Sequence, residues 1–226
     1  MRVSLEDAAV GTGLGAAVPP IRLVVDGRIP VVIAVESDER PLLVSMLLGG
    51  RLRPDSGRVL VDGAEDEAGL RNRTAVVDAP IASEPSPGIR LKTIVAEELS
   101  FASLPTSRRA VSDFLVRHRL EDYANLPVRA LPATDRIRLL AELAVLRHGV
   151  ESLVVTSPER HGGVPGEWYR PLVAIAERGV TVAIVTDLAT ANILLALGAR
   201  DGAEPQQPEA TPTETVASDI AESSPP

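Results

Sequence analysis

The sequence of 226 residues contains no cysteine and a single lysine, Lys92. The absence of cysteine excludes disulfide bonds, thiolate chemistry and cysteine-based zinc sites. No apolar run approaches the roughly 20 residues that a membrane-spanning helix needs, and the N-terminal residues lack the layout of a signal peptide. With a formal net charge of −8, the chain is a poor candidate for binding nucleic acid or anionic lipid by broad charge attraction. We therefore expect a cytoplasmic protein with no nucleic-acid partner.

The negative charge is concentrated at the C-terminal end. Residues 201–226 hold six acidic residues, no basic residue and five prolines. Such a segment has too few large apolar groups to offset the entropy lost on ordering. The sequence therefore predicts a disordered, acidic, proline-rich tail at 201–226, with an acidic arm that binds a partner as the alternative.

Strands alternate with helices in the remaining 200 residues. Short β-branched runs predict strands at 21–25, 31–35, 58–61, 74–77, 153–156 and 180–186. Helical apolar spacing and terminal glycines predict helices at 42–48, 107–123, 135–147, 167–178 and 191–197, the third of them capped by Thr134. Fully apolar strands that alternate with helices indicate a parallel sheet covered on both faces. The chain has no internal repeat.

Several local phrases occur in an order typical of one family. Residues 47–63 read LLGGRLRPDSGRVLVDG, and this phrase resembles the stretch after the Walker A helix in the nucleotide-binding domains of ABC transporters. Further on, 94–99 resembles the segment after the Q-loop, and 131–145 resembles the signature helix. Residues 151–158 resemble the Walker B strand, and 182–188 resemble the strand that carries the H-loop. The resemblance covers about residues 1–200 and implies a P-loop-NTPase-like α/β domain, with a parallel sheet flanked by helices and a helical subdomain at about 85–148.

The residues at the family's phosphate-binding loop depart from its pattern. Such a loop needs glycines that let backbone N–H groups approach the phosphates, a lysine, and a hydroxyl for Mg²⁺. The equivalent residues, 35–43, contain no glycine, with Pro41 at the lysine position and Leu42 at the hydroxyl position. Glu36, Asp38 and Glu39 stand where phosphates would lie. We hypothesise that these acids cap the following helix, since carboxylates interact favourably with a helix N-terminus; a solvated acidic loop is the alternative.

The other motif positions depart from the family in the same way. The Q-loop glutamine falls at Asp78 or Ala79, the Walker B aspartate at Thr156, the adjacent carboxylate at Ser157 and the H-loop histidine at Thr186. Glu159, two residues beyond Ser157, is a poor substitute. The signature positions 131–135 have neither the serine nor the glycines, and no aromatic residue precedes Phe101 to stack on adenine. The resemblance thus implies a pseudo-ATPase, for which we expect no catalytic, cofactor-binding or metal-binding residue and no cofactor.

Two further patterns carry little functional signal. The glycines at 11, 13 and 15 lack dinucleotide-loop spacing, and Pro19-Pro20 prevents the helix that such a loop opens, so we expect a turn. The histidines, His118, His148 and His161, have no metal-ligand spacing and no accompanying carboxylate cluster.

The resemblance suggests how a non-catalytic member could act. It implies an accessory or regulatory subunit that docks on a membrane permease or pairs with an active ABC ATPase as a homo- or heterodimer, at the inner face of the membrane through its partner. In the family, a groove beside the Q-loop receives the membrane subunit; here it would be lined from Pro80 to Phe101. Ile89, Leu91 and Phe101 are the candidate partner-binding residues, with ordinary core packing as the alternative. Two other functions remain open: a divergent ABC ATPase that still binds ATP, and a stand-alone scaffold.

Overall fold

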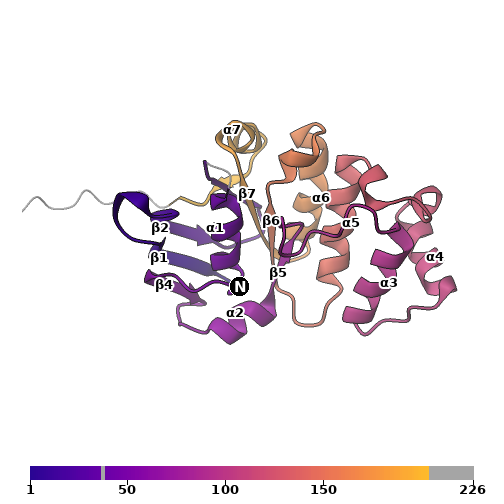
Figure 1. The fold of residues 1–226 in the computed structure, drawn as a ribbon, viewed down its shortest axis with the longest axis horizontal. Coiled ribbons are helices and arrows are strands. Elements are labelled where there is room, and N and C mark those ends of the chain that lie inside the picture. Colours follow the sequence, from indigo (N-terminus) through magenta and orange to yellow (C-terminus); the bar gives the residue numbers. More distant parts are fainter. Residues whose placement is uncertain (37–38, 204–226) are drawn as a thin grey trace, which may run out of the picture.

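The computed structural model describes residues 1–36 and 39–203, which fold into two sheets with helices between and outside them (Figure 1). The first sheet is antiparallel and has the order β2-β1-β4. Its strands are β1 (Val3–Val10), β2 (Val18–Val25) and β4 (Ser56–Val61). The glycines at 11, 13 and 15 join β1 to β2 through a 3₁₀ turn at Gly13–Gly15, which confirms the turn predicted there.

The second sheet is the predicted parallel sheet, with the order β5-β6-β7-β3-β8. Its strands are β3 (Val31–Ala34), β5 (Thr74–Val77), β6 (Ser152–Thr156), β7 (Thr181–Thr186) and β8 (Arg200–Asp201). Since every residue of β5, β6 and β7 is buried, both faces of these strands are covered, as their unbroken apolar runs indicate.

Successive side chains along the parallel strands enter two different cores, because a strand alternates its faces. In β3, Val31 and Ile33 pack with Val44 and Leu47 of α1 (Arg40–Leu48) against the antiparallel sheet, whereas Val32 faces the opposite core. Helix α1 therefore lies between the two sheets (Figure 1). The opposite face is covered by α5 (Ala133–Val145), α6 (Pro165–Glu177) and α7 (Leu188–Ala196).

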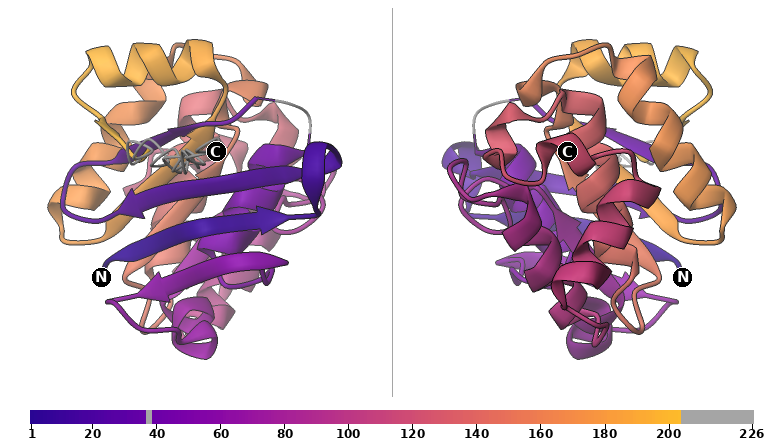
Figure 2. Two further views of the ribbon diagram at one scale, coloured as in Figure 1. Left: turned by 90° about the vertical axis from the view of Figure 1, so that its left-hand side faces the viewer. Right: turned by 90° about the vertical axis from the view of Figure 1, so that its right-hand side faces the viewer.

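The other helices lie farther from the parallel sheet. Helices α3 (Leu91–Phe101) and α4 (Arg108–Arg117) pack beside α5, on the side of the molecule opposite to the antiparallel strands (Figures 1 and 2). The short helix α2 (Glu67–Arg73) precedes β5, and single 3₁₀ turns lie at Glu121–Tyr123, Val128–Ala130 and Pro158–His161. No helix in the described part of the chain is long and apolar enough to cross a membrane.

Three predicted boundaries need correction. The helix expected at 107–123 ends at Arg117, because Arg119 takes a positive φ of 58° that a continuing helix does not allow. Thr134 does not cap α5; the helix begins one residue before it, with Pro132 at the N-cap. The first residues of the expected tail belong to the fold, since Asp201 lies in β8 and Gly202 donates to the carbonyl oxygen of Val32. Residues 204–226, the rest of that expected tail, lie outside the described residues.

Candidate functional site

The carboxyl ends of β3, β6 and β7 surround a broad depression of about 850 Å³. This edge of an open parallel sheet is where α/β folds bind ligands, because the following loops and helix N-termini converge there. The wall is formed by residues from the segments after these strands and after β5: Val35, Glu36, Pro41, Pro80, Ser157, Glu159, Arg160, Asp187, Leu188, Ala189 and Asn192.

The charges on this wall are predominantly negative. Glu36, Glu159 and Asp187 contribute carboxylates, and the one base among the lining residues is Arg160. That guanidinium lies 2.9 Å from Glu84 and is therefore already compensated. Lys92 is far from this edge, at the start of α3, where its ammonium donates to Asn125 Oδ1 at 2.7 Å. The depression thus offers phosphate groups no uncompensated cation among its described lining residues.

The expected capping of α1 by acidic side chains is wrong for Glu39. Glu39 occupies the N-cap position, but its side chain accepts no backbone hydrogen bond; its carbonyl oxygen accepts from Leu43 N instead. Its φ of −102° and ψ of −20° are helical, whereas a side-chain cap needs extended backbone at that position. In addition, Pro41 in the first turn has no N–H to donate. Asp38 lies outside the described residues.

Hydroxyl groups stand at the ends of β6 and β7. Thr156 Oγ1 donates to Ser45 Oγ of α1 at 2.8 Å, and both residues are buried. Thr186 Oγ1 donates to Glu159 Oε2 at 2.5 Å, which fixes that carboxylate at the wall of the depression. The sequence does not predict either of these hydrogen-bonded pairs, although it places Thr156 and Thr186 correctly at strand ends.

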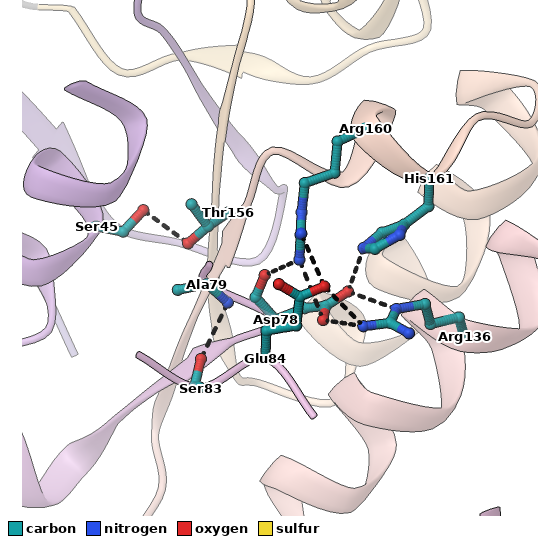
Figure 3. A network of polar contacts seen from close by, with 9 residues as sticks. All are labelled: Ser45, Asp78, Ala79, Ser83, Glu84, Arg136, Thr156, Arg160 and His161. Atoms are coloured by element: carbon teal, nitrogen blue, oxygen red, sulfur yellow. Dashed lines mark hydrogen bonds and ion pairs between the residues drawn. The ribbon is translucent and has the colours of Figure 1, made fainter. Parts of the chain in front are cut away.

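A buried ion-pair network adjoins the depression, on the side of α5 (Figure 3). Its centre is Asp78, directly after β5, whose two carboxylate oxygens accept hydrogen bonds from Arg136 at 2.9 and 2.6 Å. Both side chains are almost fully buried. Arg160 and His161 approach the same carboxylate at 3.3 and 2.7 Å. The network therefore joins the loop after β5, the first turns of α5 and the 3₁₀ turn after β6.

The cations of this network keep Asp78 ionised. Burial alone would raise the pKa of Asp78, but the contacts with His161 and Arg136 outweigh burial and lower that pKa to about 2. Glu84, in the same loop, accepts from Arg160 at 2.9 Å and lies 3.5 Å from Arg136. Two carboxylates thus face two guanidiniums, and the site is close to neutral before any charge on His161 is counted.

The surroundings of His161 correct one expectation. The sequence shows no carboxylate cluster beside a histidine, yet the fold brings ligand atoms of Asp78, Glu84 and His161 within 4.8 Å of one another. His161 is far in sequence from Asp78 and Glu84, so no spacing rule could find the cluster. The guanidiniums of Arg136 and Arg160 occupy the same carboxylates, however, and a metal ion would have to displace them. The arrangement fits an ion-pair network better than a metal centre.

The predicted partner-binding residues have very different exposures. Phe101 is 69% exposed at the end of α3, Ile89 is partly buried, and Leu91 is fully buried in the core. Leu91 is therefore not available to a docked partner, because the first turn of α3 packs inward. A groove of about 300 Å³ does lie between the loop after β5 and the helices α3 and α5, lined in part by Ala82, Glu98 and Arg147. Phe101 adjoins it, since the Arg147 guanidinium lies 5.4 Å from the centre of its ring.

Comparison with known proteins shows the fold of an ABC transporter ATP-binding cassette. A nucleotide-free ATP-binding cassette from an ABC transporter superposes with a TM-score of 0.63 at 15% identity, over 87% of this chain and 85% of that one. A dimeric bacterial ABC transporter cassette gives 0.63 at 17% identity, over 84% of this chain and 90% of that one. The protein cbiO1 from Clostridium perfringens, part of the ABC transporter complex cbiONQ, gives 0.56 at 20% identity, over 82% and 78%.

Comparisons of sequence alone give no match. No protein-family model matches the chain, and no curated protein matches it. Identities of 15–20% to the solved cassettes establish a common fold and no more.

Proposed function

We propose that this protein is a non-catalytic counterpart of an ABC transporter ATP-binding subunit. In this proposal it is cytoplasmic and acts as an accessory or regulatory partner of a membrane permease or of an active ABC ATPase. The observation that carries the proposal is the acidic depression at the carboxyl ends of β3, β6 and β7, which lacks an uncompensated base among its described lining residues.

The chemistry of phosphoryl transfer explains why that observation supports the proposal. Catalysis of this reaction depends almost wholly on positioning the phosphates and neutralising their charge. Here Glu36 and Glu159 would face the phosphates, and Pro41 stands where the resemblance places a lysine. The strand-end position of the magnesium-orienting aspartate is Thr156, whose hydroxyl is committed to Ser45. The phosphates of a nucleotide would therefore meet like charge here, and position 156 offers Mg²⁺ no carboxylate.

Thermal unfolding with and without millimolar Mg-ATP tests the first half of the proposal. A ligand at about 100 times its Kd adds about 2.7 kcal/mol of stability, which raises the Tm of a domain of this size by roughly 5–10 °C. We expect no shift, whereas an ABC cassette with intact motifs, melted in parallel, should show one. A reproducible, Mg-dependent rise in the Tm of this protein would overturn the proposal and favour a divergent ATPase.

The partner half of the proposal is supported by the groove beside α3. Phe101 is a large, exposed aromatic residue at its edge, and the charged pair of Glu98 and Arg147 lies within it, the two side chains 2.6 Å apart. Aromatic and arginine side chains are enriched at protein interfaces. The cassette of known structure from Clostridium perfringens is itself part of a multi-subunit transporter complex.

Sedimentation with membrane vesicles tests this surface. We expect the purified protein to co-sediment with inverted vesicles from the cells that produce it, and not with vesicles of their extracted lipid. The substitution Phe101→Ser should reduce co-sedimentation several-fold. Val116→Ser, which alters another exposed apolar residue on the neighbouring helix, serves as the matched control and should leave it unchanged. Equal binding of all three proteins would show that Phe101 is not part of the contact.

A further inference from the structure

The depression at the carboxyl ends of β3, β6 and β7 has an apolar as well as an acidic lining. The apolar part is contributed by the loops after β3 and β5 and by the first turns of α1 and α7, through Val35, Pro80, Pro41, Leu188 and Ala189. Leu188, the first residue of α7, is 49% exposed, whereas Leu194 of the same helix is fully buried. A hollow of about 850 Å³ with this lining has the size and character of a docking site for one or two side chains and the backbone that carries them.

The loop after β5 adds an exposed apolar residue next to this hollow. Ile81 follows Pro80, which lines the depression, and its side chain is 98% exposed. Its backbone has a positive φ of 66°, a conformation that β-branched residues rarely adopt. In the isolated protein the side chain thus gains nothing from burial, while its backbone is strained. A partner seated on the depression would cover it.

The acidic residues of the wall have no cationic partner in the described part of the chain. Glu159 accepts only the hydroxyl of Thr186, and Asp187 caps α7 by accepting from Thr190 N at 2.7 Å. Glu36, which also lines the hollow, is exposed. These three carboxylates line the same depression as the apolar side chains, a combination that complements positive charge placed beside apolar groups.

We infer that this depression is a docking site for a segment of a partner protein that carries arginine or lysine beside apolar side chains. The inference rests on the proposed function, because it requires that no nucleotide fills the same space. A second copy of the chain docked with the depression on the two-fold axis is disfavoured, since it would bring the same acidic wall onto itself. An anionic membrane surface is disfavoured for the same electrostatic reason.

Binding of designed peptides tests the inference. The probe is a short fluorescein-labelled peptide of arginine and leucine residues, titrated by fluorescence anisotropy; its counterpart has glutamate in place of every arginine. The test variant E36Q/E159Q/D187N removes the charges and keeps the hydrogen-bond acceptors for Thr186 and for the cap of α7. A control variant, E65Q/E97Q/E177Q, neutralises the same number of exposed carboxylates elsewhere.

The expected result is saturable binding of the arginine peptide that weakens with added salt and that the glutamate peptide does not share. The test variant should bind roughly tenfold more weakly, because each exposed charge pair adds a modest amount to the affinity. The control variant should stay within about twofold of the original. Ile81→Gly should also weaken binding without lowering the Tm, which separates a lost contact from a lost fold.

Three outcomes would overturn the inference: the arginine peptide fails to bind, the two triple variants bind it equally weakly, or the glutamate peptide binds as tightly as the arginine peptide. The proposed function has a separate readout: an Mg-dependent rise in the Tm with ATP, measured without the peptide, would show that the protein binds nucleotide and would refute both. If the arginine peptide does not bind and Mg-ATP does not change the Tm, the docking site is refuted and the proposed function still stands.

Discussion

Replacing Arg136 by methionine removes the guanidinium that donates two hydrogen bonds to the centre of the buried network and leaves the carboxylate of Asp78 in place. Arg136 is only 4% exposed and donates two hydrogen bonds to that carboxylate. Removing one partner of a buried ion pair costs about 3–5 kcal/mol, because the other charge remains desolvated. Asp78 keeps Arg160 at 3.3 Å and His161 at 2.7 Å, so we expect a loss near 3 kcal/mol. For a protein of this size that lowers the Tm by roughly 6–12 °C.

A double variant separates the ion pair from simple loss of packing. In D78N/R136M both charges are gone, and asparagine tolerates the positive φ of 56° at position 78 as aspartate does. Arg160 still has Glu84 at 2.9 Å. The loss of stability in the double variant should therefore be smaller than the sum of the two single losses by about 1–3 kcal/mol.

Denaturant unfolding of the original protein, R136M, D78N and D78N/R136M at pH 7 measures this coupling. R109M is the matched control, because it also removes a guanidinium that is paired with an aspartate. Arg109 on α4 is 92% exposed, however, and lies 3.8 Å from Asp113. This control should change the free energy of unfolding by less than about 0.5 kcal/mol. If R136M were as mild as R109M, or if the losses in D78N and R136M simply added, Asp78 and Arg136 would not form the buried pair described above.

Further predictions concern pH, backbone strain and the hydroxyl pair. The folded-state pKa of Asp78 is lowered to about 2 from its ordinary 3.8. The ionised carboxylate therefore adds about 2 kcal/mol to the free energy of unfolding above pH 4, and this stability is lost as the pH falls through 2. The acid unfolding curve of D78N should lack this loss. Ile81→Gly should raise the free energy of unfolding by about 0.5 kcal/mol in a urea titration, because relief of left-handed strain exceeds the entropy cost of glycine; a loss would show that Ile81 packs in solution. Thr156→Val should cost about 1–3 kcal/mol by leaving Ser45 unpaired, and the double change S45A/T156V should recover most of it in the same titration.

The parallel sheet could be predicted from the sequence because its strands are buried on both faces. Short apolar runs such as 74–77 and 180–186 are typical of strands that are covered on both faces, and they form β5 and β7. Strand β1 was not predicted, because its period-two pattern is broken. Asp7 takes a positive φ of 50° inside it, and the pairing register shifts between Leu5 and Ala8. Such a bulge moves the following residues to the other face and hides the alternation.

The motif positions could be predicted from the sequence, but the contacts at them could not. The resemblance of residues 151–158 and 182–188 to two strands of the family placed Thr156 and Thr186 at the ends of their strands, where they lie. Nothing local marks Arg136 among the many arginines as the partner of Asp78, since 58 positions separate them. The pairing follows from the packing of α5 against β5, which is a property of the whole fold.

The buried network matters more for the arrangement of the site than for its stability. A well-packed apolar cluster would stabilise the fold at least as well, because pairing charges in the interior mostly offsets the cost of desolvating them. What an apolar cluster would not do is penalise every other arrangement. Asp78, Arg136 and Arg160 belong to three segments, and their charges are satisfied only while the loop after β5, the start of α5 and the turn after β6 keep these positions. A shift of the loop after β5 or of the start of α5 separates the buried charges of Asp78 and Arg136, at a cost of several kcal/mol. These three segments are therefore expected to move as one body, held by ion pairs within the chain without a ligand between them.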